Sequence, residues 1–158
     1  MAPKSVERIL VPTDLTTAVD ALIDYSIGLA DQLGAELLFF AVLDSPTALR
    51  LIERHHDGMK RSDSAGFRSK LADDAKVLLQ ELVDRAAEHR VRASGHAVVS
   101  EKVGQEVLRE ARERNADLIV LAAEDRSMLW RFLFGDSLEE ISHLAPCPVL
   151  TVPTRTPR

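Results

Sequence analysis

The chain is poor in several kinds of residue, and each shortage excludes a class of protein. It has one cysteine among 158 residues, which excludes an internal disulfide framework and fits a reducing cytosol. No apolar run approaches the roughly 18 residues that a membrane-spanning helix needs. Residues 1–5 also lack the apolar core of a signal peptide. We therefore expect a cytoplasmic protein without a membrane segment.

Basic residues are outnumbered by acidic ones. Lys and Arg total 20 against 25 Asp and Glu, which gives a net charge of −5. Because proteins that bind nucleic acids generally carry a basic excess, we expect no nucleic-acid partner. The hydrophobic fraction of 46% and the charged fraction of 28% are typical of a globular protein with a substantial core. At this length we predict a single domain over 1–158. Within it we expect a long connection with a short helix over 44–66 and a tail over 153–158.

Aromatic residues are scarce but unevenly placed. They make up 4% of the chain, yet Trp130, Phe132 and Phe134 lie within one short segment. A cluster of this kind either packs a loop onto the domain or forms part of an interface. The sequence leaves both interpretations open.

Apolar patterns divide the chain into alternating strands and helices. The expected strands are 8–14, 36–43, 91–99, 117–123 and 147–152, and the expected helices are 17–33, 67–89, 103–114 and a segment ending at 143. The run over 36–43 is almost wholly apolar, as in a parallel strand buried on both faces. This alternation predicts a parallel sheet between two layers of helices, which is a three-layer α/β/α sandwich.

Capping residues support several of these boundaries. Gly34 and Asn115 follow predicted helices, at positions where a left-handed backbone is common. Ser45, followed by Pro46, is predicted to cap the short helix after the second strand.

The last quarter of the chain resembles the universal stress protein family. The resemblance is carried by Asp117-Leu118-Ile119-Val120 and by Ala145-Pro146-Cys147-Pro148-Val149-Leu150. It implies a Rossmann-like fold of the adenine nucleotide alpha hydrolase type, with five parallel strands in the order 3-2-1-4-5. The switch point then lies between the first and fourth strands, and ligands bind at the carboxyl ends of the strands at such points.

Nucleotide-binding members of this family carry a glycine, two residues, a second glycine, nine residues, and then glycine with serine or threonine. On this sequence Ala122 and Asp125 occupy the first two glycine positions, and Gly135-Asp136 the last pair. Only one of the three glycines is kept, and two carboxylates enter the motif. The motif is therefore degenerate.

The resemblance implies a nucleotide site that is weak or vestigial in this chain. Its expected members are Thr13, Asp14, Val42, Ala122, Asp125, Arg126, Gly135, Asp136 and Ser137. In the family, the acid at the position of Asp14 contacts adenine or ribose, and an alternative is that Asp14 only caps the next helix. No cofactor is required by this pattern, and ATP is the candidate ligand.

The sequence offers neither a catalytic set nor a clear metal site. His55-His56-Asp57 reads as part of a solvated loop, because adjacent helical residues point in different directions. Convergence of Asp14, Asp125 and Asp136 on Mg²⁺ is the alternative to separate caps and loop acids, and we favour the caps. Cys147 is expected to be a small buried residue without an activating base.

These features favour a non-catalytic, dimeric stress-response protein. The alternatives are a nucleotide-dependent switch or slow ATPase, and an enzyme of the wider alpha hydrolase group, although such enzymes keep the glycine-rich loop. The expected dimer interface is the uncharged last strand, formed by Val149, Leu150, Thr151 and Val152. The alternative is a monomer whose edge is covered by 153–158, and an additional protein partner stays open.

Overall fold

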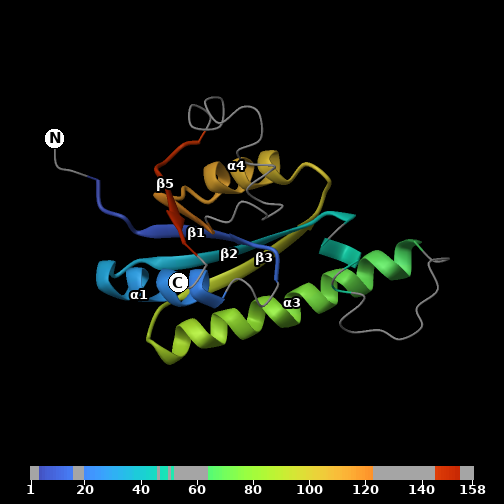
Figure 1. Ribbon diagram of the computed structural model, residues 1–158, viewed down its shortest axis with the longest axis horizontal. Helices are drawn as coiled ribbons and strands as arrows, with labels where there is room; N and C mark the ends of the chain where they lie inside the picture. The colour runs from blue at the N-terminus through green and yellow to red at the C-terminus, as the bar shows by residue number, and fades with distance from the viewer. Residues whose placement is uncertain are drawn as a thin grey trace.

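The computed structural model describes residues 4–15, 20–45, 47–49, 51, 64–122 and 145–153 (Figure 1). Its strands are β1 (Arg8–Thr13), β2 (Glu36–Leu43), β3 (Ala93–Val99), β4 (Leu118–Ala122) and β5 (Val149–Val152). Its helices are α1 (Asp20–Leu33), α3 (Ser64–Glu88) and α4 (Val103–Glu113). Residues 45, 47–49 and 51 are helical as well.

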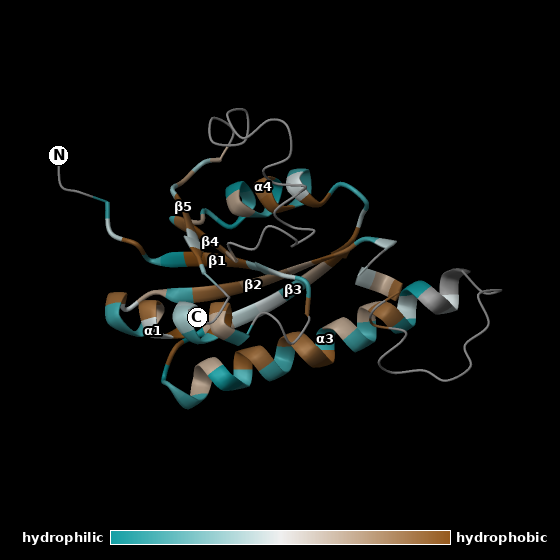
Figure 2. Cartoon of the chain, viewed as in Figure 1, coloured by the Kyte–Doolittle hydropathy of each residue, from teal (hydrophilic) through white to brown (hydrophobic). Residues whose placement is uncertain are grey.

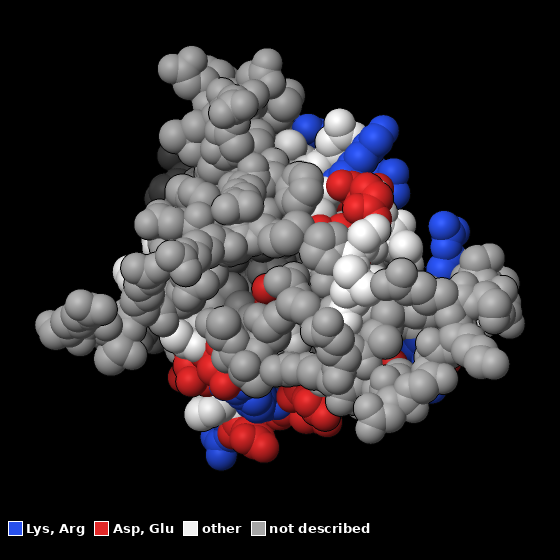
Figure 3. Space-filling model, turned by 45° about the vertical axis from the view of Figure 1, so that its right-hand side comes forward, with Lys and Arg blue, Asp and Glu red and all other residues white. Residues whose placement is uncertain are grey.

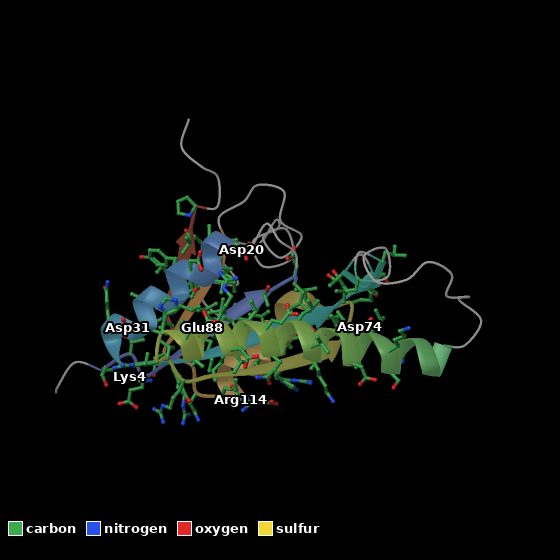
Figure 4. All side chains as sticks on the ribbon, turned by 90° about the horizontal axis from the view of Figure 1, so that it is seen from below. Lys4, Asp20, Asp31, Asp74, Glu88 and Arg114 are labelled. Carbon is green, nitrogen blue, oxygen red and sulfur yellow. The ribbon has the colours of Figure 1, made fainter. Side chains whose placement is uncertain are left out.

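The strands form one five-stranded sheet in the order β3-β2-β1-β4-β5, and every pair is parallel. α1 and α3 lie on one face of this sheet and α4 lies on the other (Figure 1). Seen from below, α1 (labelled at Asp20 and Asp31) and α3 (labelled at Asp74 and Glu88) lie side by side (Figure 4). The three-layer sandwich and the strand order predicted from the sequence are therefore confirmed.

The core is divided by the sheet into two clusters. β1 and β2 are buried over nearly their whole length, which explains their unbroken apolar sequence. One cluster joins the sheet to α1 and α3 through residues such as Val11, Phe39 and Leu79, and the other joins it to α4 through Phe40 and Val107. Figure 2 shows the apolar strands at the centre and the polar sides of the helices turned outward.

Helices end in the same way at Gly34, Arg90 and Asn115, whose φ angles are 66°, 60° and 53°. After each, the next residue donates its N–H to a carbonyl five residues back, as in the bond from Ala35 to Ala30 at 3.0 Å. The predicted caps at Gly34 and Asn115 are confirmed. The cap at Arg90 was not foreseen, because arginine carries no preference for a left-handed backbone.

Several predicted boundaries were wrong. α3 begins at Ser64, earlier than the expected start at 67, so its first turn occupies the end of the connection predicted over 44–66. β3 begins at Ala93 and not at 91. β5 begins at Val149 and not at Cys147, because Pro146 and Pro148 have no N–H to donate to a strand ladder.

The predicted cap of the short helix was also wrong. Asp44 caps it, since its Oδ1 accepts a hydrogen bond from the N–H of Thr47 at 3.0 Å. Ser45 lies inside the helix, and its N–H and hydroxyl both donate to Glu101 Oε1. A carboxylate one residue earlier in the chain thus takes the role expected of the serine.

Among the helices described, none has the length and apolar character needed to cross a membrane.

Candidate functional site

The switch point of the sheet lies between β1 and β4. Ile9 is aligned with Leu118 and Leu10 with Ile119, so the same register brings Thr13 level with Ala122 at the carboxyl ends of the two strands. On its other side, β1 is aligned with β2 up to the pair Thr13 and Ala41. Thr13, Asp14 and Ala122 therefore meet at one rim of the sheet, with Val42 on the neighbouring strand.

The exit from β1 is held by a local turn. Leu15 has a φ of 61°, and its N–H donates to Thr13 Oγ1 at 3.1 Å. Both residues are buried, and Leu15 packs into the core on the side of α1. Asp14 lies between these two anchored neighbours and is half-buried, so its backbone is held at the rim.

The exit from β2 is held by buried polar groups. Val42, Asp44 and Thr47 are 6%, 2% and 3% exposed, and the Asp44–Thr47 hydrogen bond closes the turn into the short helix. The sequence analysis assigned the cap to Ser45 and missed the capping role of Asp44. Its position three residues before Thr47 was the available signal.

A second link joins the exits of β2 and β3. Ser100 donates its N–H to the C=O of Leu43 at 3.3 Å, and Glu101 Oε1 accepts a 2.9 Å hydrogen bond from the N–H of Ser45. These contacts fix the backbone beyond Val42 from two directions. A rim built in this way can present backbone groups to a ligand without rearrangement.

The structure brings together those predicted site residues that it describes, namely Thr13, Asp14, Val42 and Ala122. The others lie outside the described residues: Asp125, Arg126, Gly135, Asp136 and Ser137, together with the cluster of Trp130, Phe132 and Phe134 and the pair His55-His56. Within the described ranges, no group of three or more His, Cys, Asp or Glu side chains is placed to hold a metal ion.

A charged contact that the sequence did not reveal lies away from the rim. Glu110 on α4 is buried, and its Oε1 lies 3.0 Å from His96 Nδ1 on β3 and 3.2 Å from Arg114 Nε. The ring of His96 is tilted against that of Phe40, with centroids 5.6 Å apart. His96 is a half-exposed strand residue, and its partner Glu110 lies on α4 among the buried residues of that helix.

Cys147 is half-buried rather than fully buried as expected. Burial and the nearby Asp117 carboxylate both raise the pKa of its thiol. A raised pKa disfavours the reactive thiolate, so the side chain is not activated as a nucleophile.

The charged residues described on the face drawn in Figure 3 are of both signs and lie interspersed. Ion pairs among the described residues include the contacts of Arg85 with Asp20 and Asp24 and of Arg8 with Glu36.

The model of the universal stress protein family matches residues 5–153, which include all five strands of the sheet. The chain belongs to the universal stress protein family. The family assignment made from the last quarter of the sequence is therefore confirmed.

One protein with a similar sequence is much longer than this chain. The Na(+)/H(+) antiporter NhaS5 of Synechocystis is 25% identical over 146 residues, which cover 92% of this chain and 19% of the antiporter. The chain thus spans about a fifth of the length of that relative.

Solved universal stress proteins share the fold at low sequence identity. One from Burkholderia pseudomallei matches with a TM-score of 0.66 and 23% identity, covering 96% of this chain and 99% of its own. A universal stress protein in complex with cAMP matches with a TM-score of 0.65 and 19% identity, covering 96% and 100%. One from Archaeoglobus fulgidus in complex with dAMP matches with a TM-score of 0.57 and 17% identity, covering 92% and 96%.

Proposed function

We propose that this universal stress protein is a non-catalytic regulatory protein that binds adenine nucleotides weakly, with an affinity that falls as phosphates are added. The observation that carries the proposal is the arrangement of Thr13, Asp14, Val42 and Ala122 on adjacent strand ends at the switch point. Ligands of open α/β sheets bind in this position. Solved members of the family hold cAMP and dAMP, which supports an adenine nucleotide as the ligand.

Hydrogen bonds hold the part of the rim that would receive adenine and ribose. The Asp44 cap and the Ser45–Glu101 contact hold the backbone beyond Val42, and the turn at Leu15 holds Asp14. A carboxylate at this place accepts hydrogen bonds from ribose hydroxyls or from the adenine amino group. Binding of the nucleoside therefore requires no change in the described strands.

The phosphate-binding part of the motif is altered in sequence. Glycines at these positions let backbone N–H groups approach phosphates closely, whereas Asp125 and Asp136 add a side chain and a negative charge. A carboxylate about 4 Å from a phosphate oxygen costs roughly 1 kcal/mol in water and several times more where partly buried. Two such costs weaken binding by more than about tenfold.

Calorimetry with adenosine, AMP, ADP and ATP tests the proposal directly. We expect the dissociation constant to rise along this series. The double variant Asp125→Gly and Asp136→Ser should strengthen ATP binding and leave adenosine binding unchanged, since adenosine has no phosphate. Asp14→Asn is the complementary variant and should weaken all four ligands alike.

The opposite affinity order would contradict the proposal. Tight ATP binding by the unmodified protein, with slow release of phosphate, would favour the nucleotide-dependent switch or slow ATPase. Absence of binding for all four ligands would leave the rim without a nucleotide role.

We also propose that the protein acts as a homodimer through β5. β5 lies at the edge of the sheet, and Val149–Val152 contains no charged residue, proline or glycine that would oppose pairing with another strand.

A further inference from the structure

β3 forms the edge of the sheet opposite β5. On the side of β3, the residues that bond to β2 are even-numbered. At one end the C=O of Arg92 accepts from the N–H of Leu37, and at the other end the N–H of Ser100 donates to the C=O of Leu43. Because residues alternate along a strand, the odd-numbered residues direct their N–H and C=O groups away from the sheet. In the part of the chain that the structure describes, these outward groups have no hydrogen-bond partner; they belong to Ala93, Gly95, Ala97 and Val99.

This edge carries none of the usual features that prevent strand addition. Ala93–Val99 contains no proline, lysine, arginine or carboxylate, and its side chains are mostly small. Its pairing with β2 is continuous from Ala93 to Val99, so no bulge turns the edge aside. A further strand can therefore approach the backbone of β3 along its full length.

The side of the edge formed by α3 is apolar and basic. α3 packs tightly under β3, where a Cβ added at Gly95 would lie 2.8 Å from Leu79 Cβ. Arg85 marks the flank of α3 that faces α1. Helical periodicity places Lys76 and Val83 on the opposite flank, beyond β3. Side chains of an added strand would meet Lys76 and the half-buried Val83 there.

The side of the edge formed by α4 is basic as well. Arg92 and His96 project from this face, since they alternate with the residues that pack on α3. Two described carboxylates lie near them: Glu110 is already engaged by His96 and Arg114, and Glu36, which the strand register places level with Arg92, is paired with Arg8. Within the described residues, Lys76 and Arg92 have no ion-pair partner. Both faces of the edge therefore carry positive charge that an acidic ligand would neutralise.

We propose that the edge of β3 binds an extended, acidic peptide segment of another protein by strand addition. The unpaired backbone groups supply the hydrogen bonds, and Lys76 and Arg92 select acidic side chains on the two faces. A second copy of this chain fits less well, because it would bring the same uncompensated cations together. The residues of the proposed nucleotide rim lie on β1, β2 and β4, and the outward groups of β3 are on the opposite side of that strand from β2, so the peptide can be tested without any nucleotide.

The probe is an acetylated, amidated peptide of repeating Glu-Glu-Val-Val, which as a strand presents glutamates on both faces, and its control has lysine in place of glutamate. Titration into the isotope-labelled protein should shift the amide resonances of Ala93, Gly95, Ala97 and Val99 and slow their hydrogen exchange. We expect the lysine peptide to bind at least about tenfold more weakly. Arg92→Glu should weaken the glutamate peptide by roughly fivefold and strengthen the lysine peptide.

Ala97→Pro tests the backbone contribution. Its missing N–H points away from β2, so the sheet should be retained while the glutamate peptide no longer binds. Ala97→Thr is the matched control, since it keeps the N–H and should bind like the unmodified protein. If Ala97→Pro does not fold, the opposite effects of Arg92→Glu on the glutamate and lysine peptides still test the proposal.

Equal binding of the two peptides, or protection confined to other amides, would overturn the proposal. A change in sedimentation mass caused by Ala97→Pro would do so as well, because it would assign the edge to a second copy of the chain.

Discussion

Arg8 and Asp117 hold each other through two hydrogen bonds that run in opposite directions. The N–H of Asp117 donates to the C=O of Arg8 at 2.8 Å, and Asp117 Oδ2 accepts from the N–H of Arg8 at 3.0 Å. The same carboxylate accepts from the N–H of Glu7 at 3.0 Å and pairs with Lys4 Nζ at 2.8 Å. Asp117 thus joins the amino ends of β1 and β4, whereas the candidate site lies at the carboxyl ends of the same strands.

Asp117→Asn should lower the free energy of unfolding by about 2 kcal/mol, because the hydrogen bonds to a largely buried carboxylate lose their charge. Chemical denaturation of the variant and the unmodified protein measures the difference. Lys4→Ala is the control, and we expect little change from it because its ammonium lies in solvent. Equal stability of Asp117→Asn and the unmodified protein would rule out the clamp.

The same carboxylate predicts a dependence of stability on pH. Burial by itself raises the pKa of Asp117, but the Lys4 ammonium and the N–H groups of Glu7 and Arg8 outweigh it, so the pKa is lowered. A lowered pKa means that the folded state binds fewer protons than the unfolded state. Its contribution is therefore complete above the ordinary aspartate pKa of about 4 and is lost as the pH falls further. The stability gap between the unmodified protein and Asp117→Asn should narrow below that pH in denaturation curves.

Gly95→Ala should destabilise the protein by roughly 1–3 kcal/mol, because the added Cβ would lie 2.8 Å from Leu79 Cβ and force α3 away from β3. Gly28→Ala is a matched control on the exposed side of α1, where nothing lies within 4 Å of the new atom. That change should stabilise the protein by up to about 1 kcal/mol, since glycine is a poor helix former. Thermal denaturation should give shifts of opposite sign, and shifts of the same sign would contradict this packing.

Arg90→Gly should stabilise the protein by about 1 kcal/mol, because Arg90 has a φ of 60° at the end of α3. Gly34→Ala makes the reverse change at the end of α1, where φ is 66°, and should destabilise by a similar amount. Urea denaturation of both variants checks the prediction. A loss of stability in Arg90→Gly would mean that its side chain contributes more than the backbone strain costs.

Thr151→Pro should convert the proposed homodimer into a folded monomer. Pro148 bonds to β4 through its C=O, so alternation directs the N–H of Thr151 away from the sheet, and proline there leaves the ladder with β4 intact. Leu150→Lys is a poorer test, because Leu150 packs against the core of its own chain. Sedimentation across the micromolar range measures the mass, and a monomeric unmodified protein would refute the proposal.

Local sequence determined the number and type of the elements that the structure describes. The apolar runs of β1 and β2 predict buried parallel strands because burial on both faces leaves no polar position. Gly34 and Asn115 marked helix ends because few other residues tolerate a left-handed backbone. The strand order and the family came from matching residues near the carboxyl end, and both are confirmed.

Tertiary structure decided which polar residues act together. Asp44 replaced Ser45 as a cap because Glu101, far along the chain, engages the serine. Glu110 is buried because His96 and Arg114 satisfy it, and Asp117 became a clamp because the amino end of β1 lies beside it. Such roles depend on contacts between residues distant in sequence. Periodicity records only which face of an element is apolar, so it cannot reveal which buried charge meets its partner.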